Sequence, residues 1–374
     1  MYDSNVSDVL ADAKATLRRL LRAGMANPAQ AAPPAGAGQG AHAAGPMPEA
    51  LRQMLRRLPG ADGHGLDLEG LPGLDLPGLD LPGLGRRRQP DPGPLPEGAT
   101  FERLTHASAE GSRDYRLYVP GGWRGQKLPL LVMLHGCTQT PEDFAAGTAM
   151  NALAEEFGFL VAYPAQSQGA NAQRCWNWFR PEDQRHGQGE PALVAGLTRE
   201  VMAQHAVDPR RIYVAGLSAG GAFAAVMGAT YPDLYAAVGV HSGLACGSAR
   251  DLPSALAAMR TGEAGTRGGR TVPTIVFHGA EDSTVSPRNG EHVAAQSGGD
   301  AKLRLKVEHG RSAGGMAYSR TQHLDGDGRA VVEHWVVEGA GHAWSGGSAA
   351  GSYTEPRGPE ASREMVRFFL SWRR

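Results

Sequence analysis

The stretch VAGLSAGGAF, residues 214–223, decides the fold because it holds one serine between two glycines at a change of pattern. The apolar run before it, residues 211–215, is typical of a buried strand, and the alanine-rich run after it is typical of a helix. The flanking glycines permit the tight turn that a strand-to-helix junction needs. The pattern predicts that Ser218 is a nucleophile on this turn, the alternative being a structural Gly-Ser loop.

Strand and helix patterns alternate from residue 99 onward. Because parallel strands need crossovers, this alternation predicts an α/β fold with a mostly parallel central sheet and helices on both faces. The segment between residues 240 and 272 is too short for a separate lid domain. The expected strands cover residues 113–119, 128–134, 159–163, 211–215, 235–240, 272–277 and 331–337, and the expected helices cover residues 141–157, 191–205, 218–231 and 360–372.

The first 98 residues differ in composition from the rest. Residues 1–25 have apolar positions spaced three and four apart, which predicts an amphipathic helix. Residues 26–98 are rich in Ala, Gly, Pro and Leu and contain GLDLPGLDLPGL at 73–84, so we interpret them as a largely disordered linker. Adsorption to a hydrophobic polymer or partner is the functional alternative to a plain spacer. Residues 99–374 form the expected catalytic domain.

Charge and hydropathy exclude several classes of protein. The net charge of -1 at pH 7 gives no field that would gather nucleic acid or an anionic membrane. No run approaches the roughly 18 apolar residues of a transmembrane helix. Residues 1–30 lack the basic-then-apolar order of a secretory signal, which predicts a cytoplasmic protein. A different start codon or signal-independent export would make an extracellular location compatible with the same sequence.

A serine nucleophile needs a base to take its proton and an acid to hold that base. At a strand-to-helix turn of this kind the order along the chain is serine, acid, histidine. Asp282 follows the strand 272–277 and is the preferred acid, with Glu281 as its rival. His342 directly follows the strand 331–337 and is the preferred base. The alternatives His309, His323 and His334 lie in or beside predicted strands.

Acyl transfer also needs donors for the developing oxyanion. The backbone N–H of Ala219, directly after Ser218, is one candidate. The loop after the strand 128–134 reads HGCTQ, and the N–H of Cys137 is the second candidate, with Thr138 and Gln139 as alternatives.

Aromatic residues mark the expected substrate contacts. The loop 166–189 carries Trp176 and Trp178 and should form one wall of the site, although an anchoring role fits Trp178 equally well. Trp344 is expected to line the acyl pocket, and Gln139 is a further candidate contact.

Three cysteines are too few for a disulfide framework, and their spacing does not suit a metal site. If a pair forms, we prefer Cys137 with Cys175, because one lies in the oxyanion loop and the other in the aromatic loop expected to lie over it. Cys246 would then stay free.

Three stretches together, LHGCTQ (134–139), GLSAGG (216–221) and GHAWSGG (341–347), resemble the polyhydroxybutyrate depolymerase family of esterases, as do the segments CWNWF (175–179) and GSYT (351–354). The resemblance implies an α/β-hydrolase fold and a Ser-His-Asp carboxylester hydrolase with no metal or organic cofactor. It favours short-chain polyhydroxyalkanoate, such as polyhydroxybutyrate or its oligomers, as substrate.

Other functions remain open at this point. Feruloyl or acetyl esters of plant polysaccharides are the alternative substrates, since relatives of this broad group act on them. A non-catalytic protein that binds polymer granules is the alternative from another class. Peptidase activity is disfavoured because no large substrate-screening domain is apparent.

Overall fold

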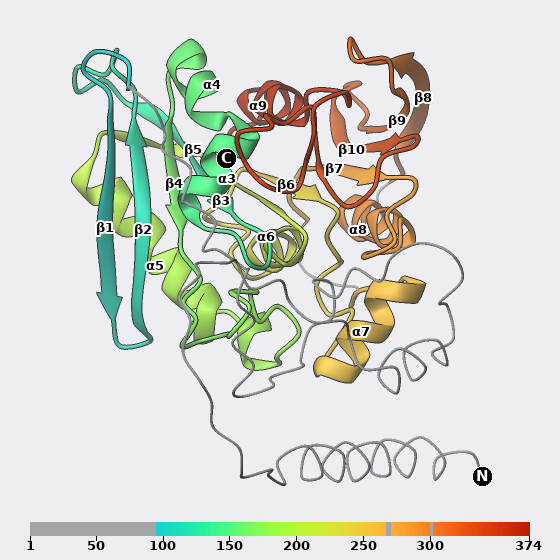
Figure 1. Cartoon of the computed structure of the whole chain (residues 1–374), viewed down its shortest axis with the longest axis horizontal. Helices are drawn as coiled ribbons and strands as arrows, with labels where there is room; N and C mark the ends of the chain where they lie inside the picture. The colour runs from blue at the N-terminus through green and yellow to red at the C-terminus, as the bar shows by residue number, and fades with distance from the viewer. Residues whose placement is uncertain (1–94, 267–270, 300–301) are drawn as a thin grey trace, which may run out of the picture. The chain divides into compact units, whose positions relative to one another are not determined.

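The computed structural model describes residues 95–266, 271–299 and 302–374, and its central feature is a ten-stranded sheet (Figure 1). The strand order is β1-β2-β4-β3-β5-β6-β7-β10-β9-β8. The six inner strands from β4 to β10 are parallel, and antiparallel strands flank them on both sides. The strands are β1 (Thr100–Ser108), β2 (Gly111–Val119), β3 (Leu128–Leu134), β4 (Leu160–Pro164), β5 (Val207–Leu217), β6 (Ala237–His241), β7 (Thr274–Gly279), β8 (Arg304–Arg311), β9 (Ala317–Leu324) and β10 (Ala330–Val337).

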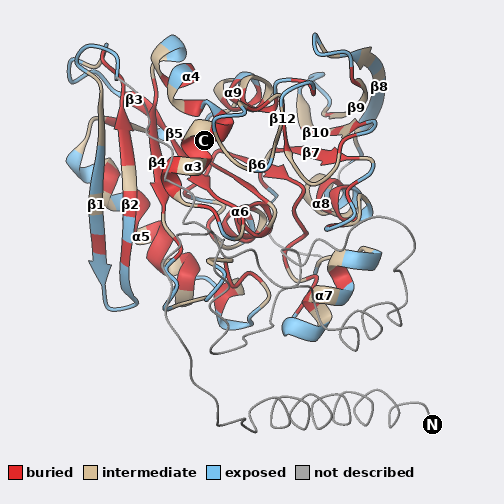
Figure 2. Cartoon of the chain, in the orientation of Figure 1, coloured by how far each residue is buried: buried red, intermediate tan, exposed pale blue. Residues whose placement is uncertain are grey.

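Helices cover both faces of this sheet. On one face α5 (Gly189–Gln204), α6 (Ala219–Thr230) and α8 (Arg288–Gly298) pack on the strands, with α7 (Leu252–Thr261) against α8. The other face carries α3 (Pro141–Thr148), α4 (Met150–Phe157) and α9 (Ala361–Leu370). Each face has its own apolar core, and Figure 2 shows the inner strands buried between them. The predicted α/β fold class is confirmed.

The register of the inner strands brings their carboxyl ends to one edge. Leu134 of β3 pairs with Gly216 of β5, and Leu217 pairs with His241 of β6. Farther along the sheet, Gly279 at the end of β7 pairs with Val337 at the end of β10. The loops that follow these strands therefore meet at the same edge of the sheet.

The single helix expected over residues 141–157 is wrong, because two helices occupy this segment. Ala149 separates them with a φ of 52°. The carbonyl of Gly147 accepts from the N–H of Ser348 at 2.8 Å, and that of Thr148 accepts from the Ser362 hydroxyl at 2.6 Å. Two helical carbonyls thus bond to the C-terminal part of the chain, and the helix breaks there.

Several elements were not anticipated, among them β1, β8, β9, α7, α8, the short turn Glu182–Gln184, and the small parallel pair β11 (Trp344–Ser345) and β12 (Thr354–Glu355). Between β6 and β7 the described residues form the helix α7 and connecting loops. The expected helix 1–25 lies outside the described residues, and so does the expected linker apart from residues 95–98. No helix in the described ranges is both long and apolar enough to span a membrane.

Candidate active site

Ser218 occupies a strained turn between β5 and α6. Its φ of 57° lies in the left-handed region, which non-glycine residues rarely adopt. Its N–H donates to the carbonyl of His241 at 2.9 Å. A Cβ at Gly220 would lie 2.1 Å from the carbonyl oxygen of Leu134, so only glycine lets α6 approach β3 this closely. The structure therefore places Ser218 on a tight strand-to-helix turn, which is the position that a nucleophile elbow requires.

Asp282 and His342 form a hydrogen-bonded pair on neighbouring loops. Nδ1 of His342 lies 2.7 Å from Oδ2 of Asp282. The other oxygen, Oδ1, accepts from the backbone N–H groups of Thr284 and Val285 at 2.9 and 2.8 Å. Asp282 is buried, whereas its rival Glu281 is exposed. The structure therefore joins the preferred acid to the preferred base.

The environment keeps Asp282 ionised. Burial by itself raises the pKa of this carboxyl, but hydrogen bonds from His278 and His342 hold the pKa well below its ordinary value. A carboxylate in this state can hold the imidazole with its Nδ1 proton toward Asp282 and balance the positive charge of an imidazolium.

His278 is a second imidazole on this carboxylate, and the sequence analysis did not select it. Its Nε2 lies 2.9 Å from the carbonyl oxygen of Val285 and 3.4 Å from Oδ2 of Asp282, and the side chain is fully buried. A carbonyl can only accept, so Nε2 carries a proton. The sequence feature that could have identified it is a histidine at the end of β7, four residues before the acid.

His241 links the elbow to the loop of His342. Its carbonyl accepts from Ser218, its Nε2 accepts from the N–H of Ser345 at 2.9 Å, and its ring stacks on Trp344 with centroids 5.0 Å apart. Burial lowers its pKa to about 3, which keeps it a neutral acceptor. Within the described residues, the Ser218 hydroxyl makes no hydrogen bond to His342.

The expected oxyanion loop lies beside the amino terminus of α6. Ala219 is the first residue of this helix, where backbone N–H groups have no helical partner. Across the described residues, no hydrogen bond uses the N–H of Cys137, although its neighbours Gly136 and Thr138 donate to Gln139 Oε1 and to the Gln173 carbonyl. Both proposed donors are thus left available.

Gln139 supports this loop and is not placed to contact a substrate. Its side chain is buried, accepts from the N–H of Gly136 at 2.9 Å, and donates to Asp143 at 2.9 Å and to the carbonyl of Ser352 at 3.2 Å. All its polar atoms are engaged within the protein, so the expected substrate contact is corrected to a positioning role.

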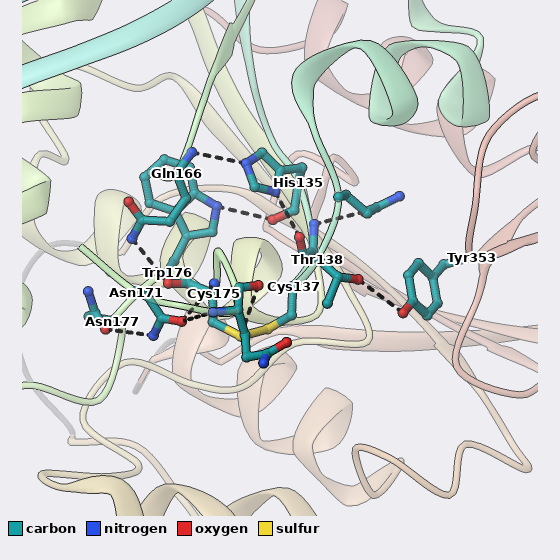
Figure 3. The surroundings of a disulfide bond; sticks show 12 residues. His135, Cys137, Thr138, Gln166, Asn171, Cys175, Trp176, Asn177 and Tyr353 are labelled. Atoms are coloured by element: carbon teal, nitrogen blue, oxygen red, sulfur yellow. Dashed lines mark hydrogen bonds between the residues drawn. A yellow bond between two sulfur atoms is a disulfide. The ribbon is translucent and has the colours of Figure 1, made fainter. Parts of the chain in front are cut away.

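The preferred cysteine pair is confirmed. Cys137 and Cys175 form a disulfide that ties the oxyanion loop to the loop 166–189 (Figure 3). His135 joins the same two segments, because its Nε2 accepts from the N–H of Gln166 at 3.0 Å. Burial lowers the pKa of His135 to about 4 and raises that of the free thiol of Cys246 to about 11.

The tryptophans expected to touch substrate lie inside the protein. Trp176 is 0% exposed, stacks on Phe223 of α6 with centroids 4.9 Å apart, and donates to the carbonyl of His135 at 3.0 Å. Trp178 is 5% exposed, which fits the anchoring alternative. Trp344 is 1% exposed and donates to the Ser362 hydroxyl at 3.0 Å. These side chains hold the loops together, and the expected contacts are not supported.

Potential metal ligands do not gather in the described part of the chain. Over those residues, no three His, Cys, Asp or Glu side chains form a group that could hold an ion. The site that the structure describes consists of an elbow serine, a carboxylate-bound imidazole and two available amides.

Comparisons with known proteins identify the family of this chain. The family model described as esterase PHB depolymerase matches residues 113–306. Poly(3-hydroxyalkanoate) depolymerase C of Paucimonas lemoignei is 34% identical over 257 residues, which make up 64% of this chain and 61% of that protein. Feruloyl esterase B of Thermothelomyces thermophilus is 29% identical over 235 residues, or 57% of this chain and 78% of that protein. This chain thus spans less than two thirds of the depolymerase that it matches.

A solved structure shows the same fold. The acetyl xylan esterase from Aspergillus awamori superimposes with a TM-score of 0.58 at 20% identity, covering 72% of this chain and 99% of that one. At this identity the likeness shows the fold alone, which is the α/β-hydrolase fold expected from the sequence.

Proposed function

Because the chain belongs to the polyhydroxybutyrate depolymerase family of esterases, we propose that it is a serine carboxylester hydrolase that works through an acyl-enzyme. The observation that carries this proposal is the hydrogen bond of 2.7 Å between Asp282 and His342, on loops at the same edge of the sheet as the strained Ser218. A carboxylate-held imidazole next to an elbow serine is the arrangement that activates a hydroxyl for acyl transfer.

In the proposed reaction, Oγ of Ser218 attacks the ester carbonyl carbon while its proton passes to Nε2 of His342. Asp282 balances the imidazolium through Nδ1. The N–H groups of Ala219 and Cys137 donate to the oxyanion, and the amino terminus of α6 adds a favourable dipole. The carbon–oxygen bond to the alcohol then breaks, and His342 returns the proton to the leaving alcohol. His342 then takes a proton from a water molecule, whose oxygen attacks the acyl carbon. The bond from that carbon to Oγ breaks, and His342 returns the proton to Oγ, which releases the acid and restores Ser218.

The proposed substrate is short-chain polyhydroxyalkanoate or its oligomers. The depolymerase of Paucimonas lemoignei supports this choice, whereas the feruloyl and acetylxylan esterases among the relatives support the alternative of plant polysaccharide esters. Adsorption to polymer through residues 26–98 belongs to the same proposal. If it is correct, removal of residues 1–98 lowers activity on amorphous polyhydroxybutyrate and spares activity on soluble esters.

The compartment also belongs to the proposal. A cytoplasmic protein was expected from residues 1–30, with export as the alternative. The disulfide between Cys137 and Cys175 favours the alternative, because such bonds persist in oxidising compartments and are rare in the cytosol. Fractionation of the native host tests this choice by locating the protein. Blocking free thiols before lysis then shows whether Cys137 and Cys175 are joined in the cell, as export requires.

Turnover of p-nitrophenyl butyrate tests the function itself. The enzyme requires hydrolysis that disappears in Ser218→Ala, whereas a granule-binding scaffold would show no turnover in either form. Comparison of amorphous polyhydroxybutyrate, feruloylated arabinoxylan and acetylated xylan as substrates then separates the two substrate proposals.

A further inference from the structure

Tyr353 is an exposed aromatic residue beside the candidate active site. It is 45% exposed, and it lies on the loop between β11 and β12. Its φ of 52° is in the left-handed region, which a tyrosine adopts only at a conformational cost. An aromatic ring kept at the surface by a strained backbone needs a reason other than the packing of the core.

Two hydrogen bonds place Tyr353 between the loops that carry the proposed chemistry. Its hydroxyl lies 3.2 Å from Oγ1 of Thr138, the residue after the proposed oxyanion donor, and Figure 3 shows this hydroxyl pointing toward Thr138. Its carbonyl accepts from the N–H of Trp344 at 2.7 Å, two residues after His342. The residue therefore touches both the oxyanion loop and the histidine loop.

The backbone around Tyr353 is held by a hydrogen-bonded network of the half-buried Asp143 and the buried Gln139. Asp143 accepts from the N–H of Ser352 at 3.0 Å and from its hydroxyl, and it also accepts from Gln139. Gln139 in turn holds the N–H of Gly136 in the oxyanion loop. One connected network thus fixes the position of the ring relative to the proposed oxyanion donors, so the exposed surface is preorganised.

We propose that Tyr353 is a specificity-determining residue whose ring packs against the apolar chain of the ester next to the reacting carbonyl. This inference rests on the proposed function and deepens it. Unlike the buried Trp176 and Trp344, Tyr353 presents an accessible ring at the rim of the site. Aromatic rings favour aliphatic chains and other rings, so the preferred substrates are esters that extend beyond the carbonyl, in contrast to methyl acetate.

The test compares kcat/KM for a linear trimer of 3-hydroxybutyrate with kcat/KM for methyl acetate in a pH-stat. In Tyr353→Ala the ratio of the two should fall about tenfold, which is the usual effect of losing one aromatic contact. Tyr353→Phe keeps the ring and should keep the ratio. Phe157→Ala is the matched control, because Phe157 is 41% exposed on α4. It should behave like the wild type, and melting temperatures confirm that each variant is folded.

A ratio unchanged in Tyr353→Ala, or one lowered equally in Phe157→Ala, overturns the inference. A binding measurement separates this failure from failure of the proposed function. Calorimetry with the trimer on Ser218→Ala, with and without Tyr353→Ala, should show a Kd about ten times higher in the double variant. If the wild type hydrolyses no ester but binding still depends on the ring, the proposed function fails and the contact stands. If Kd is the same in both variants, the contact is refuted.

Discussion

Replacing Asp282 with asparagine should reduce kcat about 10³- to 10⁴-fold, equivalent to about 4–5.5 kcal/mol of transition-state stabilisation. The structure supplies the reason. Oδ1 accepts two backbone N–H groups, so the asparagine oxygen stays there and the NH₂ group takes the place of Oδ2. That group is a donor, and it would face Nδ1 of His342, which lies 2.7 Å from Oδ2. The imidazole then favours the tautomer with its proton on Nε2, which cannot accept the proton of Ser218.

The assay is hydrolysis of p-nitrophenyl butyrate across the pH range in which both proteins stay folded. Glu281→Gln is the control, because it removes the neighbouring but exposed carboxylate and should leave kcat within about twofold of the wild type. A loss smaller than tenfold in Asp282→Asn, or an equal loss in both variants, would refute the assignment of the acid.

Three further predictions concern stability. Cys175→Ser opens a link across 38 residues and should lower the free energy of unfolding by up to about 4 kcal/mol, seen as a lower Tm; an unchanged Tm contradicts this. Gly220→Ala puts a Cβ 2.1 Å from a carbonyl oxygen and should lower Tm sharply, whereas Gly122→Ala meets no atom within 4 Å and should not; equal Tm values would refute the argument. Burial raises the pKa of the Asp183 carboxyl to about 6 in the folded protein, above its ordinary value. The folded state therefore holds this proton more tightly than the unfolded state, and the free energy of unfolding falls as pH rises from about 4 through 6. Asp183→Asn should therefore raise Tm more at pH 8 than at pH 4, and a pH-independent difference would exclude this cause.

The central strands could be predicted because continuous runs of apolar residues mark them in the sequence. All seven residues of β3 are apolar or proline and all are buried, so its predicted and observed bounds agree. The edge strand β8 gives no such signal, because its apolar residues Leu305 and Val307 remain exposed. Figure 2 shows β8 largely in the colour of exposed residues. It is a strand because its backbone pairs antiparallel with the next strand, β9, and this backbone pairing does not require the buried side chains that mark a central strand.

The pair of Asp282 and His342 could be predicted for a topological reason. Both residues follow strands, and parallel strands bring the following loops to one edge. The substrate contacts could not be predicted in this way, because the side of a loop that faces solvent depends on long-range packing. Trp176 illustrates this, since its ring is covered by Phe223 of α6, which lies far away in the sequence. Tyr353, in a segment noted only for its resemblance to the family, is an aromatic residue that stays exposed beside the site.

Two buried polar residues explain how loops from separate strands keep one geometry. His241 satisfies an N–H of the histidine loop and accepts the N–H of the elbow serine through its carbonyl, while Gln139 joins the oxyanion loop to Ser352. An unsatisfied buried backbone group costs about 1–3 kcal/mol, so each loop is held in the position that satisfies its partner. Because burial holds the pKa of His241 near 3, this acceptor does not titrate at the pH where esters are hydrolysed. His241 and Gln139 therefore keep the same protonation state and hold the loops in place while His342 transfers the proton of Ser218.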